Sequence, residues 1–167
     1  AKVKLFEKRI EEYEMMLDES TIWLVRLQGV GYANAEEMVA AGVSGPNVRA
    51  AGVNYDVRWA HPYSVYDEID WEPAVEKPTS VKGADCYDRY RVRIEEMRQS
   101  CRMLLDAIEK IPGGKNTNYS NGDEMIYTKA PTRAPEGATG FSNYECTRGA
   151  SQFYIQGGGE GRGKMPY

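Results

Sequence analysis

The sequence is poor in the side chains from which metal and cofactor sites are built. Its 167 residues include one histidine and three cysteines, and no two of the cysteines form a CxxC pair. Zinc and iron–sulfur sites need clustered thiolate or imidazole ligands. We therefore predict that this chain binds no metal and no cofactor, and that it supplies no catalytic residue. Free thiols of this kind suit a reducing compartment.

Long apolar runs and an excess of basic charge are also absent. No uncharged apolar run approaches the roughly 20 residues of a membrane-spanning helix, so we expect any membrane association to come through partner subunits. Lysine and arginine number 21 against 25 aspartates and glutamates, which gives a net charge of −4. This balance offers no electrostatic basis for binding nucleic acid. The opening AKVKLFEKR has no initiator Met and no signal-peptide core, so we expect a processed chain or part of a longer one.

Two motifs suggest chemistry but have simpler explanations. Residues 158–164 satisfy GxxxxGK, the pattern of a phosphate-binding loop, yet Met165 stands where a magnesium-binding Ser or Thr would follow. A glycine-rich hairpin turn is the favoured interpretation. His61 precedes Pro62 in a predicted loop, and no signature nucleophile motif accompanies it. A packing or interface role is favoured over catalysis.

Hydrophobic periodicity predicts a mainly helical front region. Residues 3–17 form an amphipathic helix whose stripe we expect to be buried: Val3, Phe6, Ile10, Tyr13 and Leu17. A second helical segment spans 21–27, and Asn34 with Glu37 predicts a capping box that opens a helix over 35–41. The longest predicted helix ends at Pro112 and has apolar residues at alternating spacings of three and four: Tyr87, Tyr90, Ile94, Met97, Cys101, Leu104, Ile108 and Ile111.

The rest of the chain favours loops and a small sheet. We expect a packed irregular segment over 44–66 and an exposed loop over 72–83. Eleven of the 17 glycines lie from Gly113 onward, and residues 152–156 are the best strand candidate. The predicted class is therefore α+β, mainly helical. We predict three regions. Residues 1–112 form a helical scaffold that contains an irregular motif segment at 42–71. Residues 113–143 form a loop-rich linker, and residues 144–167 form a glycine-rich β hairpin.

Two stretches carry a specific family resemblance: GVSGPNVRAAGVNYDVRWAHPYSVYDEIDW at 42–71 and CYDRYRVRIEEMRQSCRMLLDAIEKIP at 86–112. Together they resemble the C-terminal portion of the 49 kDa subunit of respiratory complex I, the proton-pumping NADH:quinone oxidoreductase. The family pattern is close to GLTGPxLRASGxxYDxRKxxPYxxYD followed by DxYDRYxVRxEEMRxSxxI. Residues 145–149 also resemble the family's Glu-x-x-Arg-Gly turn. The resemblance implies a portion of a hydrogenase-large-subunit-like helical bundle.

The resemblance also implies a role inside a larger enzyme. The complex is expected to use NADH, FMN, iron–sulfur clusters and quinone, whereas this chain lacks the family's N-terminal β segment with its quinone-head histidine and tyrosine. The chain would then scaffold the quinone cavity without being catalytic alone. Expected partners are a companion chain with the N-terminal half, peripheral-arm subunits that include the terminal iron–sulfur subunit, and the membrane arm through those partners. The expected location is the matrix side of the mitochondrial inner membrane or the cytoplasmic side of a bacterial plasma membrane.

Four charged residues lie in glycine- or aromatic-rich turns that match the family motif, and we predict them as interaction residues: Arg49, Asp56, Arg58 and Arg148. Structural ion pairing is the alternative role for each of them. Two other functions stay open at this point. The chain could be a piece of the large subunit of a membrane-bound nickel–iron hydrogenase or an F420 dehydrogenase, or a non-catalytic structural or assembly subunit.

Overall fold

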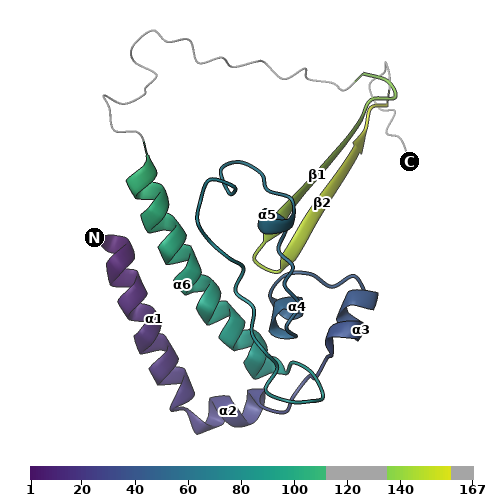
Figure 1. Ribbon diagram of the computed structural model, residues 1–167. Coiled ribbons are helices and arrows are strands. Elements are labelled where there is room, and N and C mark those ends of the chain that lie inside the picture. Colours follow the sequence, from purple (N-terminus) through teal and green to yellow (C-terminus); the bar gives the residue numbers. More distant parts are fainter. Residues whose placement is uncertain (112–134, 159–167) are drawn as a thin grey trace. The chain divides into compact units, whose positions relative to one another are not determined.

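The computed structural model describes residues 1–111 and 135–158. The helices and strands of this described part are labelled in Figure 1: α1 Lys2–Asp18, α2 Thr21–Leu27, α3 Ala35–Ala40, α4 Pro46–Ala50, α5 Val57–Ala60, α6 Cys86–Lys110, β1 Thr139–Cys146 and β2 Gly149–Gln156. The two strands pair with each other in one sheet. This mixture of helices and a small hairpin confirms the predicted α+β, mainly helical class.

The chain divides into two compact units. The first comprises Ala1–Glu109 and Tyr144–Ser151, so it holds the described helices and the base of the hairpin. The second comprises Lys110–Asn143 and Gln152–Tyr167. The candidate site described below lies within the first unit.

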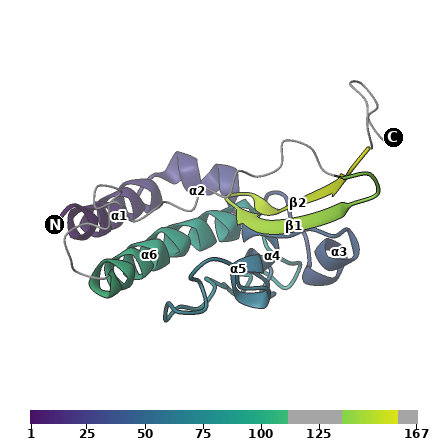
Figure 2. The same cartoon turned by 90° about the horizontal axis from the view of Figure 1, so that it is seen from above.

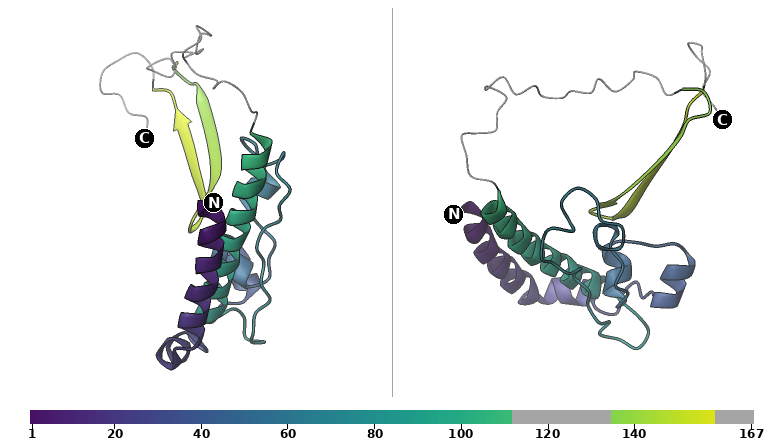
Figure 3. Two further views of the ribbon diagram at one scale, coloured as in Figure 1. Left: turned by 90° about the vertical axis from the view of Figure 1, so that its left-hand side faces the viewer. Right: turned by 45° about the horizontal axis from the view of Figure 1, so that its top comes forward.

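The helices α1 and α6 lie side by side in antiparallel directions (Figures 2 and 3). At one end of the pair the Tyr87 hydroxyl of α6 donates a hydrogen bond of 3.1 Å to Asp18 of α1. Ile10 of α1 is fully buried in a cluster with Ile94 and Cys101 of α6. Burial of such an aliphatic side chain contributes about 1.5–3 kcal/mol, so this cluster holds the two helices together.

The predicted buried stripes are only partly buried. Phe6 and Tyr13 of α1 are 47% and 51% exposed, and Leu104 and Ile108 of α6 are 52% and 56% exposed. Ile111, the last residue of the predicted stripe, is 66% exposed. The expectation of burial is therefore wrong at these five positions. The two helices form a single layer, and no element among the described residues covers these side chains.

A reciprocal capping box opens α6. The Asp85 carboxylate accepts a hydrogen bond of 2.9 Å from the Asp88 backbone N–H, and Asp88 accepts one of 3.2 Å from the Asp85 N–H. Asp88 also accepts from the backbone N–H of Thr79, and Asp85 from that of Gly29 at 2.8 Å. Two buried carboxylates therefore attach two loops to a helix N-terminus, where the helix dipole favours negative charge.

The predicted capping box agrees with the structure, whereas the motif segment does not. The predicted capping box is present, because Asn34 accepts a hydrogen bond of 2.8 Å from the Glu37 N–H at the start of α3. The segment expected to be irregular instead contains α4 and α5. Pro46 begins α4, where its missing N–H costs nothing, and Asp56 caps α5. Helices of four and five residues are too short to produce a readable period.

The hairpin begins earlier than the sequence predicts. β1 starts at Thr139, inside the stretch 113–143 that the sequence predicts as a loop-rich linker, and the turn is Thr147-Arg148. The family-like turn at 145–149 is thus confirmed as a turn. Of the glycine-rich turn expected at 158–164, Gly158 is described and residues 159–164 lie outside the described residues. None of the helices in the described ranges combines the length and the apolar character needed to cross a membrane.

Candidate functional site

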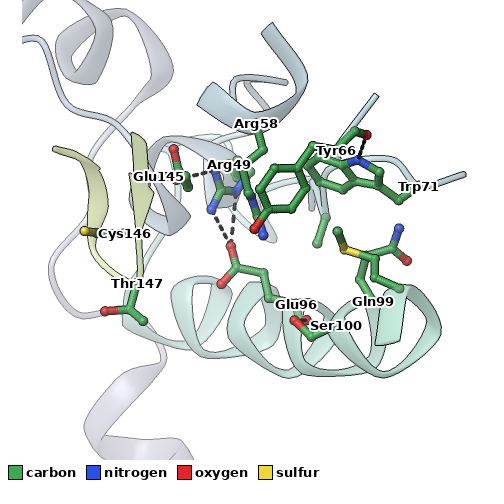
Figure 4. Close-up of a pocket in the computed structure, with 12 residues that line it drawn as sticks. Arg49, Arg58, Tyr66, Trp71, Glu96, Gln99, Ser100, Glu145, Cys146 and Thr147 are labelled. Atoms are coloured by element: carbon green, nitrogen blue, oxygen red, sulfur yellow. Dashed lines mark hydrogen bonds and ion pairs between the residues drawn. The ribbon is translucent and has the colours of Figure 1, made fainter. Parts of the chain in front are cut away.

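Arg49 lies at the centre of a buried charge network in the first unit. It occupies the last turn of α4, and its side chain is only 2% exposed. Its guanidinium lies 3.1 Å from Asp56, 2.5 Å from Glu96 and 3.0 Å from Glu145. Figure 4 shows the guanidinium between the carboxylates of Glu96 and Glu145. A charge this deeply buried is stable only when it is paired and hydrogen-bonded.

The hydrogen bonds of Arg49 join separate parts of the chain. Nε and Nη2 both donate to Oε1 of Glu96 on α6, at 3.1 and 2.5 Å. Nη1 donates to the Tyr55 carbonyl and to Oε1 of Glu145 on β1, both at 3.0 Å. One side chain therefore connects α4, the turn before α5, α6 and the hairpin base.

Asp56 and Arg58 form the second part of the network. Asp56 is completely buried, and its two carboxylate oxygens accept from Nε of Arg58 at 3.0 Å and from Nη2 at 2.7 Å. Burial alone would lower the pKa of the Arg58 guanidinium, but the hydrogen bonds and charge of Asp56 outweigh it and raise that pKa. The Arg58 guanidinium also lies over the Trp71 ring, 4.8 Å from its centroid, and over the Tyr66 ring at 5.6 Å.

Glu145 attaches the hairpin base to the motif segment. Its second carboxylate oxygen accepts a hydrogen bond of 3.2 Å from the Val57 N–H at the start of α5. Its own backbone N–H donates to the Tyr63 hydroxyl at 3.3 Å. With a side chain that is 4% exposed, Glu145 is as much a part of the core as the arginine that it pairs with.

A cavity of about 200 Å³ adjoins the network. Its walls come from the motif segment, α6 and the hairpin base (Figure 4), and include Arg58, Tyr66, Trp71, Glu96, Gln99 and Glu145. The two arginines and three carboxylates of the network sum to a charge of −1, so the cavity presents no excess positive charge to an anion. The arrangement is suited to rigid positioning of the surrounding elements.

Metal binding does not fit this part of the chain. The Arg49 guanidinium pairs with all three carboxylates, and within residues 1–111 and 135–158 no group of His, Cys, Asp or Glu side chains is arranged to hold a metal ion. The three cysteines, Cys86, Cys101 and Cys146, are free thiols. An iron–sulfur cluster therefore has no ligand set among the described residues.

Comparisons with known proteins assign the family. The family described as "Respiratory-chain NADH dehydrogenase, 49 Kd subunit" matches residues 1–167. The chain belongs to this family. It is 49% identical over 158 residues to an NADH-quinone oxidoreductase subunit of Solibacter usitatus, in a match that covers 90% of this chain and 40% of that protein. It is 35% identical to an NADH-quinone oxidoreductase subunit of Chloroherpeton thalassium, with 95% of this chain and 39% of that protein covered.

A solved structure supports the same fold. The chain superposes on a chain of the membrane-bound sulfane sulfur reductase, an archaeal respiratory membrane complex, with a TM-score of 0.74 at 27% identity. The match covers 94% of this chain and 40% of that one. This member of the 49 kDa family thus spans about 40% of the length of the relatives that it matches.

The structure brings together three of the four predicted interaction residues. Arg49, Asp56 and Arg58 belong to one network, whereas Arg148 is exposed in the hairpin turn and pairs with no other described residue. Sequence reasoning missed Glu96 and Glu145. The sequence carried a signal for both glutamates, because each lies in a stretch that matches the sequence pattern of the 49 kDa family. In the Glu-x-x-Arg-Gly turn the glutamate, rather than the arginine, joins the buried network.

Proposed function

We propose that this chain is a structural part of the quinone module of a respiratory NADH:quinone oxidoreductase, where it scaffolds the quinone cavity. The observation that carries the proposal is 49% identity to an NADH-quinone oxidoreductase subunit across 90% of the chain. The buried Arg49 network supports it, because a rigid connection between α4, α6 and the hairpin base is what a scaffold requires. Arg49, Asp56 and Arg58 are positioning residues in this proposal, and Arg148 is a surface residue available to a partner.

The chain would act through its neighbours. The enzyme as a whole would oxidise NADH and pass electrons through FMN and iron–sulfur clusters to quinone, with coupled proton translocation. The contribution of this chain would be shape, a low-dielectric interior and an interface. Side chains that contact a substrate must be held within about 0.5 Å of their productive geometry by the residues behind them, and the Arg49 network would supply this support to residues of a companion chain.

The expected partners follow from the same proposal. The companion chain would carry the N-terminal half of the subunit, and the terminal iron–sulfur subunit and other peripheral-arm subunits would pack beside it. Attachment to the membrane arm would come through these partners. The complex would lie on the matrix side of the mitochondrial inner membrane or on the cytoplasmic side of a bacterial plasma membrane.

Deletion of the gene tests the proposal. Membranes that lack this chain should lose NADH oxidation by a short-chain quinone, while NADH oxidation by ferricyanide, an acceptor that does not need the quinone site, should persist. Mass spectrometry of the complex extracted in mild detergent should find this chain beside flavin-binding and iron–sulfur subunits. A chain that migrates alone on a native gel, or a deletion that leaves quinone reduction unchanged, would overturn the proposal.

A second candidate function comes from the structural comparison. The chain superposes well on a subunit of a membrane-bound sulfane sulfur reductase, so it could instead serve a related membrane complex with another electron acceptor, such as a hydrogenase or an F420 dehydrogenase. The sequences of the companion chains decide between them. CxxC pairs at both ends of the assembled large subunit would indicate a nickel–iron hydrogenase, and a quinone-reducing activity lost on deletion would indicate the first proposal.

A further inference from the structure

Three aromatic side chains lie in a row where α2 passes the start of α6 (Figure 1). The side chains of Trp23, Tyr90 and Tyr87 form this aromatic triad. The Trp23 and Tyr90 rings meet edge to face with their centroids 5.5 Å apart, and the Tyr90 and Tyr87 centroids are 5.6 Å apart. Centroid distances of about 4.5–7 Å are those of rings in contact. The triad therefore provides an unbroken path of contacting rings from α2 to Tyr87.

The three members of the triad differ in where a proton can go. The Trp23 indole N–H is buried and has no acceptor within the described part of the chain. The Tyr90 hydroxyl is buried there without a hydrogen bond as well. The Tyr87 hydroxyl, in contrast, donates a hydrogen bond of 3.1 Å to the carboxylate of Asp18. Asp18 is half-buried at the end of α1, so it can pass a proton on to water.

This difference decides which member of the triad can be oxidised to a stable product. An aromatic side chain that loses an electron becomes a strong acid, so the loss is easiest where a base within hydrogen-bond reach takes the proton. Burial and the hydrogen bond to Asp18 raise the pKa of the Tyr87 phenol, which therefore still carries its proton at neutral pH. Trp23 is half-buried and open to a dissolved oxidant, but its proton has no outlet. An electron vacancy formed at Trp23 should therefore move on to Tyr87.

The charges near Tyr87 favour an electron vacancy at this end of the triad. Asp18 and Glu14 both act on the phenol with negative charge, and Arg91 acts with the opposite sign. The Arg91 guanidinium is paired with Glu76 at 3.1 Å, which reduces its effect. Negative charge beside a ring stabilises the positive charge that develops as an electron leaves.

A second row of aromatic rings has the opposite electrostatic setting. Tyr63 contacts Tyr66 with centroids 5.1 Å apart, and Tyr66 contacts Trp71 with centroids 6.0 Å apart. The Arg58 guanidinium lies over both the Trp71 and the Tyr66 rings. A cation held against a ring face makes the removal of an electron from that ring harder. This second row is therefore suited to packing, whereas the triad is suited to oxidation.

We propose that the aromatic triad is a site of one-electron oxidation, at which Trp23 gives an electron to a dissolved radical oxidant and Tyr87 ends as a neutral tyrosyl radical. With the carbonate radical anion as oxidant, one electron leaves Trp23 and carbonate is formed. Tyr87 returns one electron to Trp23 through Tyr90, and its phenolic proton goes to Asp18. A thiol or ascorbate then restores the phenol by giving a hydrogen atom. The inference goes beyond the proposed function and does not depend on it, since no step uses quinone or a partner subunit.

Radical trapping in the detergent-extracted complex tests the inference. The complex is exposed to carbonate radical, made by photolysis of a carbonato cobalt(III) ammine, together with the nitroso spin trap 2-methyl-2-nitrosopropane. Peptide mapping by mass spectrometry then measures trap adducts at Tyr87. Trp23→Phe should lower the Tyr87 adduct roughly tenfold, a rate change equivalent to about 1.4 kcal/mol in the barrier. Trp59→Phe is the matched control, because Trp59 is 50% exposed on α5, and it should leave the Tyr87 adduct unchanged.

Substitution of the proton acceptor tests the assignment without loss of a ring. Asp18→Asn keeps an oxygen that can accept the Tyr87 hydrogen bond, but the amide is not a base. This variant should lose the Tyr87 adduct and gain adduct at Trp23, whereas Asp18→Glu should restore the wild-type pattern. A merely structural role of Asp18 would not move the radical from one ring to the other. A wild-type complex without adduct at Tyr87, or an unchanged Tyr87 adduct in Trp23→Phe or in Asp18→Asn, would overturn the inference.

Discussion

Gly45 and Gly149 pack backbone against backbone. A Cβ atom built on Gly45 would lie 2.4 Å from the Gly149 Cα, and one built on Gly149 would lie 2.6 Å from the Ser44 Oγ. Both glycines have positive φ, at 75° and 136°. The base of the hairpin therefore contacts the start of α4 at a distance that only glycine allows, and this contact brings Glu145 within hydrogen-bonding distance of Arg49.

Gly45→Ala should be strongly destabilising. Gly45 has φ 75° and ψ −153°, a backbone conformation that is essentially restricted to glycine and costs another residue about 1–3 kcal/mol. The close contact with Gly149 adds a forced backbone shift, so we expect a loss of about 3 kcal/mol or more. Gly42→Ala is the matched control, because Gly42 has φ 69° and no heavy atom within 4 Å of the added Cβ. Urea unfolding of the recombinant chain, expressed without partner subunits, measures both. Equal losses in the two variants would show that the close approach has no energetic role.

Arg49→Met should destabilise the protein by about 3–5 kcal/mol, because it leaves buried carboxylates without their counter-charge. Arg102→Met is the control, since Arg102 is 59% exposed in its pair with Glu95 and such surface pairs contribute about 0–1 kcal/mol. The two variants would be compared by urea unfolding at low and high salt.

A double variant separates charge from packing at Arg49. Glu145→Gln combined with Arg49→Met removes one of the unpaired charges, so the double variant should be less unstable than the sum of the two single variants. Strict additivity would mean that Arg49 and Glu145 are not energetically coupled, which would contradict a stabilising ion pair between them.

The motif segment shows how far the sequence could predict the site. Arg49, Asp56 and Arg58 were predicted as interaction residues because they are charged residues in glycine- or aromatic-rich turns that match the family motif, and the structure places all three in one network. Glu96 and Glu145 were missed because their contacts with Arg49 span 47 and 96 residues of sequence. Periodicity describes one face of one helix, and it carries no information on which distant residue will meet that face.

The long helix shows the same limit for the fold. Its spacing correctly predicted α6, and it also predicted burial along the whole stripe. Ile94 is 4% exposed, whereas Ile108 is 56% exposed. Periodicity identifies a face that is suited to packing, and the covering element can lie outside the chain that carries the face.

Stability should fall at high pH through Tyr90. Burial raises the pKa of the Tyr90 phenol to about 12, with smaller contributions from the negative charges of Asp18 and Glu14. An unfolded tyrosine ionises near pH 10, so the folded state holds its proton more tightly. This contribution to stability is complete below about pH 10 and is lost as the pH rises toward 12.

Tyr90→Phe tests that assignment. The variant should show a shallower decline in the free energy of unfolding between pH 10 and 12 than the wild type. A comparison at pH 7, where the phenol is neutral in both states, serves as the control for packing changes. Identical slopes in the two proteins would assign the high-pH decline to other groups.

Ile10→Ala should separate α1 from α6. Ile10 is fully buried against Ile94 and Cys101, so its truncation leaves a cavity, and we expect a loss of about 2–5 kcal/mol. Ile22→Ala is the control, because Ile22 is 71% exposed on α2 and exposed substitutions usually change stability by less than about 0.5 kcal/mol. Urea unfolding measures the loss of stability. Limited proteolysis should show that α1 is cleaved faster in Ile10→Ala than in Ile22→Ala. Equal rates of cleavage in the two variants would show that Ile10 does not hold α1 against α6.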